Sequence, residues 1–395
     1  MRKKAALAAA FCVFAFGMVG CQKPATNVNT TEATTAAVEE STTAAPQETE
    51  ETSQETTEAA KEEETTASEP DYPTLPLPEY HYTGTEDWAE YADGVSHFLV
   101  ENSFGDVSPD LTICVPIVLK ADDSDPKDVK LWGEFYVEGF NLAKTSLLNV
   151  NGGSFGGVAH LDTTKGGPIV TDFDFLEDGA GFDASLEELF GKEGLKDAYL
   201  KASNERDKYL AEALANYINT NGLYITQYQE YGWPPVPVLN APPTKDEDQI
   251  VDYEGSYDYT AKYDMREICS YETGESDMFC NVESEDWNEF LIVVYKAESN
   301  DLDSAITELR AGLADENAEL ERKDDITFLD IEGCTLLMSN GPYKEGDQVY
   351  VNYFVPRGDD LLVLKISSTY SEDEKIQVAT DDIIEDFIDG IKFKG

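Results

Sequence analysis

Basic residues and histidines are scarce in this chain of 395 residues. It contains 28 Lys and Arg against 80 Asp and Glu, a formal net charge of −52, and only three histidines. A phosphate-binding surface needs clustered Lys or Arg, so we expect no nucleic-acid partner. The acidic excess also opposes docking onto anionic lipid, so a link to a membrane should be covalent rather than electrostatic.

Cysteine motifs of metal and redox sites are missing as well. The six cysteines include no Cys-x-x-Cys pair, which leaves zinc and thioredoxin-like chemistry without support. The acidic cluster at residues 172–183 does not follow the spacing of an EF-hand loop either. The sequence therefore predicts no metal and no cofactor.

Apolar runs are short, and the first one begins directly after Arg2-Lys3-Lys4. It covers residues 5–19, less than the roughly 20 apolar residues of a membrane-spanning helix. A basic start, a short apolar middle and small residues at the cut are typical of a secretory signal. We therefore expect residues 1–20 to be a signal peptide.

Met18-Val19-Gly20-Cys21 resembles the lipobox of bacterial lipoproteins. The resemblance implies cleavage before Cys21 and a diacylglyceryl thioether on its sulfur, with palmitate among the acyl chains. One acyl chain anchors only marginally, so stable attachment needs two or three. We expect an anchor on Cys21 at the extracytoplasmic face of the cell membrane; the alternative is a secreted protein in which Cys21 is incidental.

Aromatic residues are absent from residues 25–70, which are almost entirely Thr, Glu, Ala and Ser. Such a stretch cannot bury enough apolar surface to offset chain entropy. We therefore predict a disordered Thr/Glu-rich linker, with the lipidated cysteine, over residues 21–78. Its 46 or so low-complexity residues would reach on the order of 150–165 Å when fully stretched, which suits a spacer through part of a cell wall.

Residues 79–240 are predicted to form a first α+β domain. Helical spacing over Trp88–Glu101 and Lys196–Asn219 predicts two helices. Runs separated by turn residues predict an antiparallel sheet between them. The predicted strands are residues 111–120, 129–140, 146–150, 157–161 and 169–175.

Several motifs in this part resemble a domain of many exported or membrane-bound bacterial proteins. They are Leu131-Trp132-Gly133-Glu134-Phe135, Gly152-Gly153-Ser154 through His160-Leu161, Glu177-Asp178-Gly179, Phe190-Gly191 and Tyr228–Pro234. The resemblance implies a curved sheet of the NTF2-like or cystatin-like kind and an exported location. Relatives commonly carry His and Pro where this chain has Phe155 and Gly156, so the resemblance implies no reaction.

Gly152-Gly153-Ser154-Phe155-Gly156 matches the G-x-S-x-G motif of serine hydrolases. That motif needs a strand-to-helix elbow with Asp and His later in the chain. Here the following residues continue as a strand, and the only later histidine is His160. We interpret the segment as a glycine-rich hairpin or bulge.

Asp172 and Asp174 belong to an acidic cluster with Glu177, Asp178 and Asp183. Strand alternation places the first two on one face and Phe173 and Phe175 on the other. We interpret the cluster as a solvated face with a helix cap. Ligand binding or acid–base work by Asp172 or Asp174 with His160 is the alternative.

A proline-rich stretch at residues 233–243 indicates a stiff, extended connection. We predict a linker at 241–252 and a second α+β domain over 253–395. Its order of strands, a helix at 302–314, a meander and a last helix at 372–389 resembles Mog1/PsbP-like or DcrB-like domains. No signature motif accompanies that resemblance.

Four cysteines remain after the signal and the lipidation site. Cys269 and Cys280 flank a predicted turn, so they could face each other across a hairpin and form a disulfide in an exported protein. Cys114 and Cys334 lie inside apolar, strand-like runs, which predicts buried thiols.

The leading functional hypothesis is a non-catalytic, lipid-anchored protein for binding or scaffolding at the cell envelope. It rests on the linker, the two modules and the missing catalytic motifs. Its partner would be a cell-wall component, a surface protein or a small molecule. One alternative is a hydrolase that uses Ser154 and His160, and another is a lipoprotein that binds a small ligand or a cation.

Overall fold

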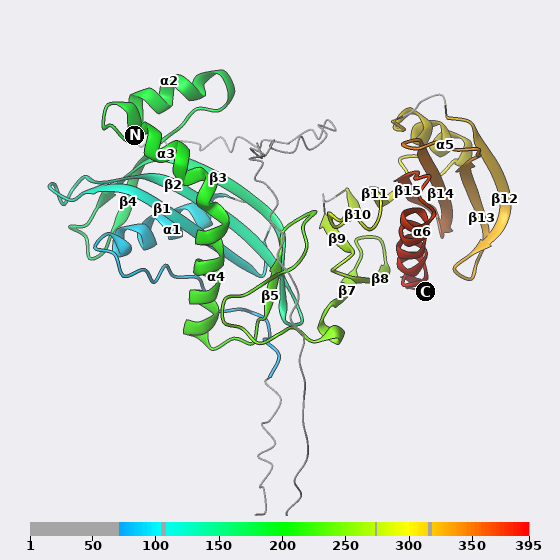
Figure 1. Ribbon diagram of the computed structural model, residues 1–395, viewed down its shortest axis with the longest axis horizontal. Helices are drawn as coiled ribbons and strands as arrows, with labels where there is room; N and C mark the ends of the chain where they lie inside the picture. Colours follow the sequence, from blue (N-terminus) through cyan, green and yellow to red (C-terminus); the bar gives the residue numbers. More distant parts are fainter. Residues whose placement is uncertain (1–70, 104–107, 273–274, 315–317, 395) are drawn as a thin grey trace, which may run out of the picture. The chain divides into compact units, whose positions relative to one another are not determined.

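The computed structural model of the chain describes residues 71–103, 108–272, 275–314 and 318–394. The predicted signal peptide, Cys21 and the linker up to residue 70 lie outside the described residues. The described residues form helices and three mainly antiparallel β-sheets, which confirms the α+β class (Figure 1). Among them, no helix is long and apolar enough to span a membrane.

The first sheet has the strand order β1-β2-β3-β5-β6, with β4 also paired to β3. Its strands are β1 (Leu111–Asp122), β2 (Val129–Ala143), β3 (Ser146–Asp162), β4 (Ile169–Phe175), β5 (Gln227–Gln229) and β6 (Val236–Pro237). The neighbours β1 to β4 are antiparallel, whereas β5 runs parallel to β3. A mainly antiparallel sheet is therefore present, with one parallel pair that was not predicted.

Strand β2 has a helix on each of its faces. Phe135 and Val137 share a core with α1 (Ala89–Ser103). Tyr136 and Phe140 share a different core with α4 (Arg206–Asn221). Because alternate residues of a strand point to opposite faces, this double burial explains why nearly every residue of β2 is buried.

Strand β3 is continuous through the glycine-rich segment, so the predicted hairpin is wrong. It pairs with β2 from Ser146 to Leu161 without a turn. A bulge does occur near the segment, where the register shifts between Gly139 and Phe140 of β2. Long pairing along β2 stabilises an extended backbone that glycine alone does not favour.

The helix predicted over residues 196–219 is interrupted. It consists of α3 (Lys196–Ala202), a 3₁₀ turn (Ser203–Glu205) and α4, which is followed by Gly222 in the left-handed conformation with φ of 63°. A left-handed glycine after the last turn is a common helix terminator. Three short helical segments between β4 and α3 were not predicted: Gly179–Gly181, α2 (Phe182–Leu186) and a π-turn (Glu187–Gly191).

The remaining residues form a large sheet and a small one. The large sheet has the order β12-β13-β14-β15-β11-β10-β9, and the small one β16-β8-β7. Their strands are β7 (Ile250–Glu254), β8 (Tyr259–Asp264), β9 (Ile268–Glu272), β10 (Ser276–Asn281), β11 (Phe290–Lys296), β12 (Leu320–Phe328), β13 (Ile331–Ser339), β14 (Gln348–Arg357), β15 (Asp360–Thr369) and β16 (Lys392–Phe393).

The two helices of this part share cores with alternate residues of β15. Leu364 and Ile366 belong to the core of α6 (Glu374–Asp389). Leu361 and Val363 belong to the core of α5 (Leu302–Ala311). Side chains on opposite faces of one strand thus hold both helices, close to their predicted positions. Asp301 caps α5, since its side chain accepts a hydrogen bond from the backbone N–H of Ser304 at 3.0 Å.

The predicted linker at 241–252 is partly regular. It contains a 3₁₀ turn (Asp246–Asp248), and β7 already begins at Ile250. Lys144 donates hydrogen bonds to the carbonyls of Glu247 and Ile250, which orders the backbone here. The strand therefore starts before residue 253, and the division into two domains stays a prediction.

Candidate functional site

The G-x-S-x-G segment faces two buried acids of β2. In the β2–β3 register, Gly156 lies opposite Glu134 and Gly152 lies opposite Glu138. A Cβ atom at either glycine would collide with a carboxylate oxygen of the glutamate across from it. The glycines of the motif therefore make room for carboxylates.

Ser154 is a hydrogen-bond donor to one of these acids. Its hydroxyl and that of Tyr199 bind the two carboxylate oxygens of Glu134, which is 1% exposed. Burial raises the pKa of Glu134, and the two hydroxyl donors oppose that rise. The arrangement satisfies a buried acid and gives Ser154 no histidine partner.

The second acid, Glu138, is paired with a cation. Arg206 donates to it from Nε at 3.1 Å, and Asn149 donates to its other oxygen at 3.0 Å. Arg206 also forms an ion pair with Glu230 at 2.5 Å. Breaking a buried ion pair of this kind leaves a buried charge without a partner, so we assign the pair of Glu138 and Arg206 a structural role.

His160 has both ring nitrogens engaged by carboxylates. Nδ1 lies 2.7 Å from Asp128, and Nε2 lies 3.3 Å from Asp174. The bond from His160 lowers the pKa of Asp128. Asp172 pairs with His160 in register, but its Oδ1 accepts a bond from the backbone N–H of Phe173.

The hydrolase geometry predicted as an alternative is not formed. His160 lies six positions after Ser154 on one continuous strand, which corresponds to about 20 Å at 3.3 Å per residue. A nucleophile and its base must lie within hydrogen-bond reach. Among the four predicted candidates, the structure brings together His160 and Asp174 and leaves Ser154 apart.

The cysteines lie where the sequence predicted. Cys269 and Cys280 are direct partners in the β9–β10 pair, with Sγ atoms 3.0 Å apart and both present as thiols. Their disulfide stays a prediction. Cys114 and Cys334 are fully buried, and burial raises the pKa of Cys114 to about 12.

The other two histidines of the chain meet at α1. His81 precedes the helix, and Asp93 and His97 lie one turn apart on it. The ligand atoms of these three side chains lie within 4.8 Å of one another. The sequence reasoning missed this cluster; the four-residue spacing of Asp93 and His97 within a predicted helix was the available signal.

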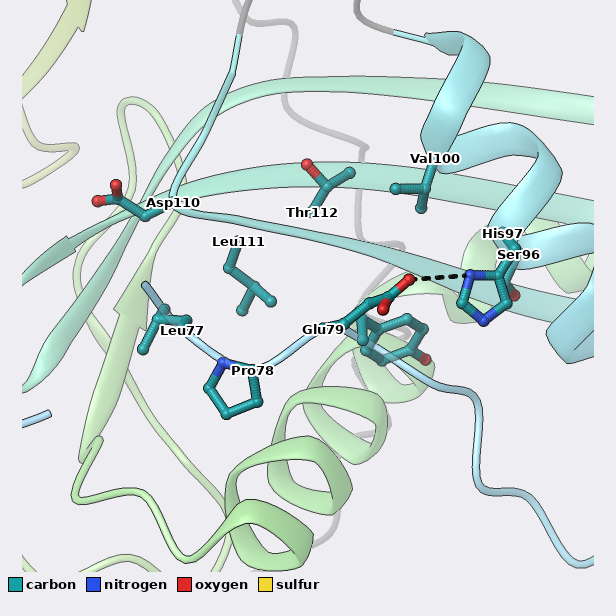
Figure 2. Close-up of a pocket in the computed structure, with 10 residues that line it drawn as sticks. Leu77, Pro78, Glu79, Ser96, His97, Val100, Asp110, Leu111 and Thr112 are labelled. Atoms are coloured by element: carbon teal, nitrogen blue, oxygen red, sulfur yellow. Dashed lines mark ion pairs between the residues drawn. The ribbon is translucent and has the colours of Figure 1, made fainter. Parts of the chain in front are cut away.

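A pocket adjoins this cluster and shares His97 with it. Its volume is about 200 Å³. Figure 2 shows Leu77 and Pro78 on one side and Thr112 of β1 and Val100 of α1 on the other. Glu79 reaches towards His97, with its Oε1 3.5 Å from Nδ1.

Comparison with known proteins does not assign the chain to a family. No protein-family model matches the chain, and no curated protein matches it. The resemblances to NTF2-like, cystatin-like and Mog1/PsbP-like domains therefore stay predictions.

Proposed function

We propose that this chain is a lipid-anchored extracytoplasmic protein that binds a ligand or partner at the cell envelope and catalyses no reaction. One observation supports binding over hydrolysis. Ser154 donates a hydrogen bond to Glu134. His160, which lies further along the same strand, contacts Asp128 and Asp174 instead. Neither side chain can activate the other across this separation.

The pocket beside His97 is the proposed binding surface. Its volume of about 200 Å³ falls below the roughly 300–1,000 Å³ of sites that enclose a drug-sized molecule. A small molecule, or one side chain of a surface protein or cell-wall peptide, fits this space. Leu77, Leu111 and Val100 supply apolar contacts, whereas Glu79 and His97 supply polar ones.

The anchor rests on Met18-Val19-Gly20-Cys21. Metabolic labelling with a palmitate analogue, followed by fractionation, tests the anchor in Cys21→Ala. The matched control is Cys12→Ala, which removes the cysteine inside the predicted signal peptide. The natural chain and the control should be labelled and membrane-bound, whereas Cys21→Ala should carry no label. A Cys21→Ala chain that stays attached and labelled would overturn the anchor.

The absence of catalysis is tested with the purified full chain. Hydrolysis of a p-nitrophenyl ester should not exceed that of a Ser154→Ala variant with the same melting temperature. An activity that disappears in Ser154→Ala would restore the hydrolase hypothesis.

A further inference from the structure

His81, Asp93 and His97 form a triangle of metal-ligand atoms. His81 Nδ1 lies 3.0 Å from His97 Nε2 and 3.6 Å from Asp93 Oδ2, and His97 Nε2 lies 3.7 Å from the same oxygen. Around zinc, bonds of roughly 2.0–2.1 Å in a tetrahedron place neighbouring ligand atoms about 3.3 Å apart. The three observed separations bracket that value.

We propose that His81, Asp93 and His97 bind a divalent transition-metal ion of the zinc type. Three protein ligands leave the fourth tetrahedral position to water or to a group in the adjoining pocket. Two imidazoles suit zinc, copper or nickel, whereas calcium and magnesium require shells made of oxygen. The proposal does not depend on the lipid anchor.

The second ligand sphere points to the same ion. Glu79 Oε1 lies 3.5 Å from Nδ1 of His97, the ring nitrogen that is not a ligand in the proposed site. Metal-bound histidines commonly donate their other N–H to a carboxylate, which fixes the tautomer and orients the ring. Glu79 also adds negative charge beside a dication.

Asp93 is oriented in a similar way. Its Oδ1 accepts a hydrogen bond from the backbone N–H of Tyr82 at 2.7 Å, while Oδ2 faces both histidines. The side chain is 29% exposed. One oxygen is thus held by the protein, and the other is free to coordinate.

The surrounding structure limits movement of the ligands. The helix that carries Asp93 and His97 buries Ala92, Val95 and Leu99. On either side of His81, Tyr80 packs against Tyr217 with ring centroids 6.1 Å apart, and Tyr82 stacks on Trp88 at 5.9 Å. Anchored neighbours reduce the entropy that must be lost when an exposed His81 side chain binds an ion.

The proposal is tested by measuring zinc binding to the full chain. The chain is purified in detergent without a histidine tag and is treated with a chelator to remove bound metal. A competition titration with a chromophoric chelator measures stoichiometry and affinity. We expect one zinc ion per chain at this site, bound at least about tenfold more weakly by His81→Gln and by His97→Gln. Glu79→Gln should weaken binding by about tenfold.

His160→Gln is the matched control, because it removes the third histidine, which lies outside the triangle. It should bind zinc as the natural chain does. Cobalt supplies a second readout, since a four-coordinate Co²⁺ site gives visible absorption bands that His97→Gln should lose. Apo melting temperatures identify any variant that fails to fold.

Two results would overturn the proposal. One is zinc affinity that is unchanged in folded His81→Gln and His97→Gln, which would place the ion on the acidic surface elsewhere. The other is no zinc binding at all, which would make the 3.0 Å contact a histidine–histidine hydrogen bond. Neither result would alter the Cys21 labelling, so the two proposals fail separately.

Discussion

Glu134 lies directly across from Gly156 in the β2–β3 pair, and the missing side chain of this glycine leaves room for the carboxylate. Tyr199 and Ser154 complete the surroundings of that acid by donating hydrogen bonds to it. The G-x-S-x-G segment thus leaves space for a buried acid and donates a hydrogen bond to it, and its serine has no histidine partner among the described residues that would make it a nucleophile.

Gly156→Ala should destabilise the fold. The added methyl group would meet the Tyr199 hydroxyl, Leu176 and the Glu134 carboxylate, and overpacking of this kind costs about 1–3 kcal/mol. Gly153→Ala is the matched control, because its methyl group meets only the ring of Phe155. Urea denaturation measures both, and equal losses would contradict this account of Gly156.

Glu134→Gln should change how stability depends on pH. The pKa of Glu134 is raised in the folded protein above its ordinary value of 4.5. Its protonated form therefore contributes stability that is complete below that value and is lost as the pH rises through the folded pKa. The free energy of unfolding of the natural chain should fall relative to Glu134→Gln above pH 4.5, by at most about 1.4 kcal/mol per pH unit. Parallel urea titrations across this window measure the difference, and a constant difference would refute the assignment.

Tyr259→Phe should cost about 1.5–3 kcal/mol, the range for a hydrogen bond to a charged group. The Tyr259 hydroxyl donates to Asp277 at 2.8 Å, and both residues are 0% exposed. Asp277 would keep its two bonds from Ser256. Tyr257→Phe, which removes a bond near the surface, should cost less. Denaturation midpoints measure both variants, and similar costs would contradict the role of burial.

If the chain is exported as proposed, Cys269 and Cys280 should be joined by a disulfide. Their direct pairing brings the thiols together, and an exported protein meets oxidising conditions. Mass spectrometry without reduction should find the linked peptides, with Cys114 and Cys334 as free-thiol controls. Cys280→Ser should then lose on the order of 2–3 kcal/mol, because the loop that is closed is short. Free thiols at both positions would refute the prediction.

Local sequence patterns were sufficient to predict α1, α5 and α6, most of the strands and the burial of Cys114 and Cys334. Each follows from a periodicity or an apolar run within one segment. Local patterns failed to predict that the glycine-rich segment lies within one continuous strand. The sequence of one strand does not show how far a partner strand pairs with it. Local patterns also missed β7, whose backbone is ordered by the distant Lys144.

Composition and short-range spacing are enough to indicate the α+β class and the acidic character, and to predict an anchor at Cys21. Which side chains contact one another is known only from the folded chain. The pairing of Glu134 with Gly156 depends on strand register, in which a one-residue slip would move every side chain to the other face. The meeting of His81 with His97 depends on how the segment before α1 folds back along that helix. Such contacts join residues far apart in the chain, so no local pattern records them.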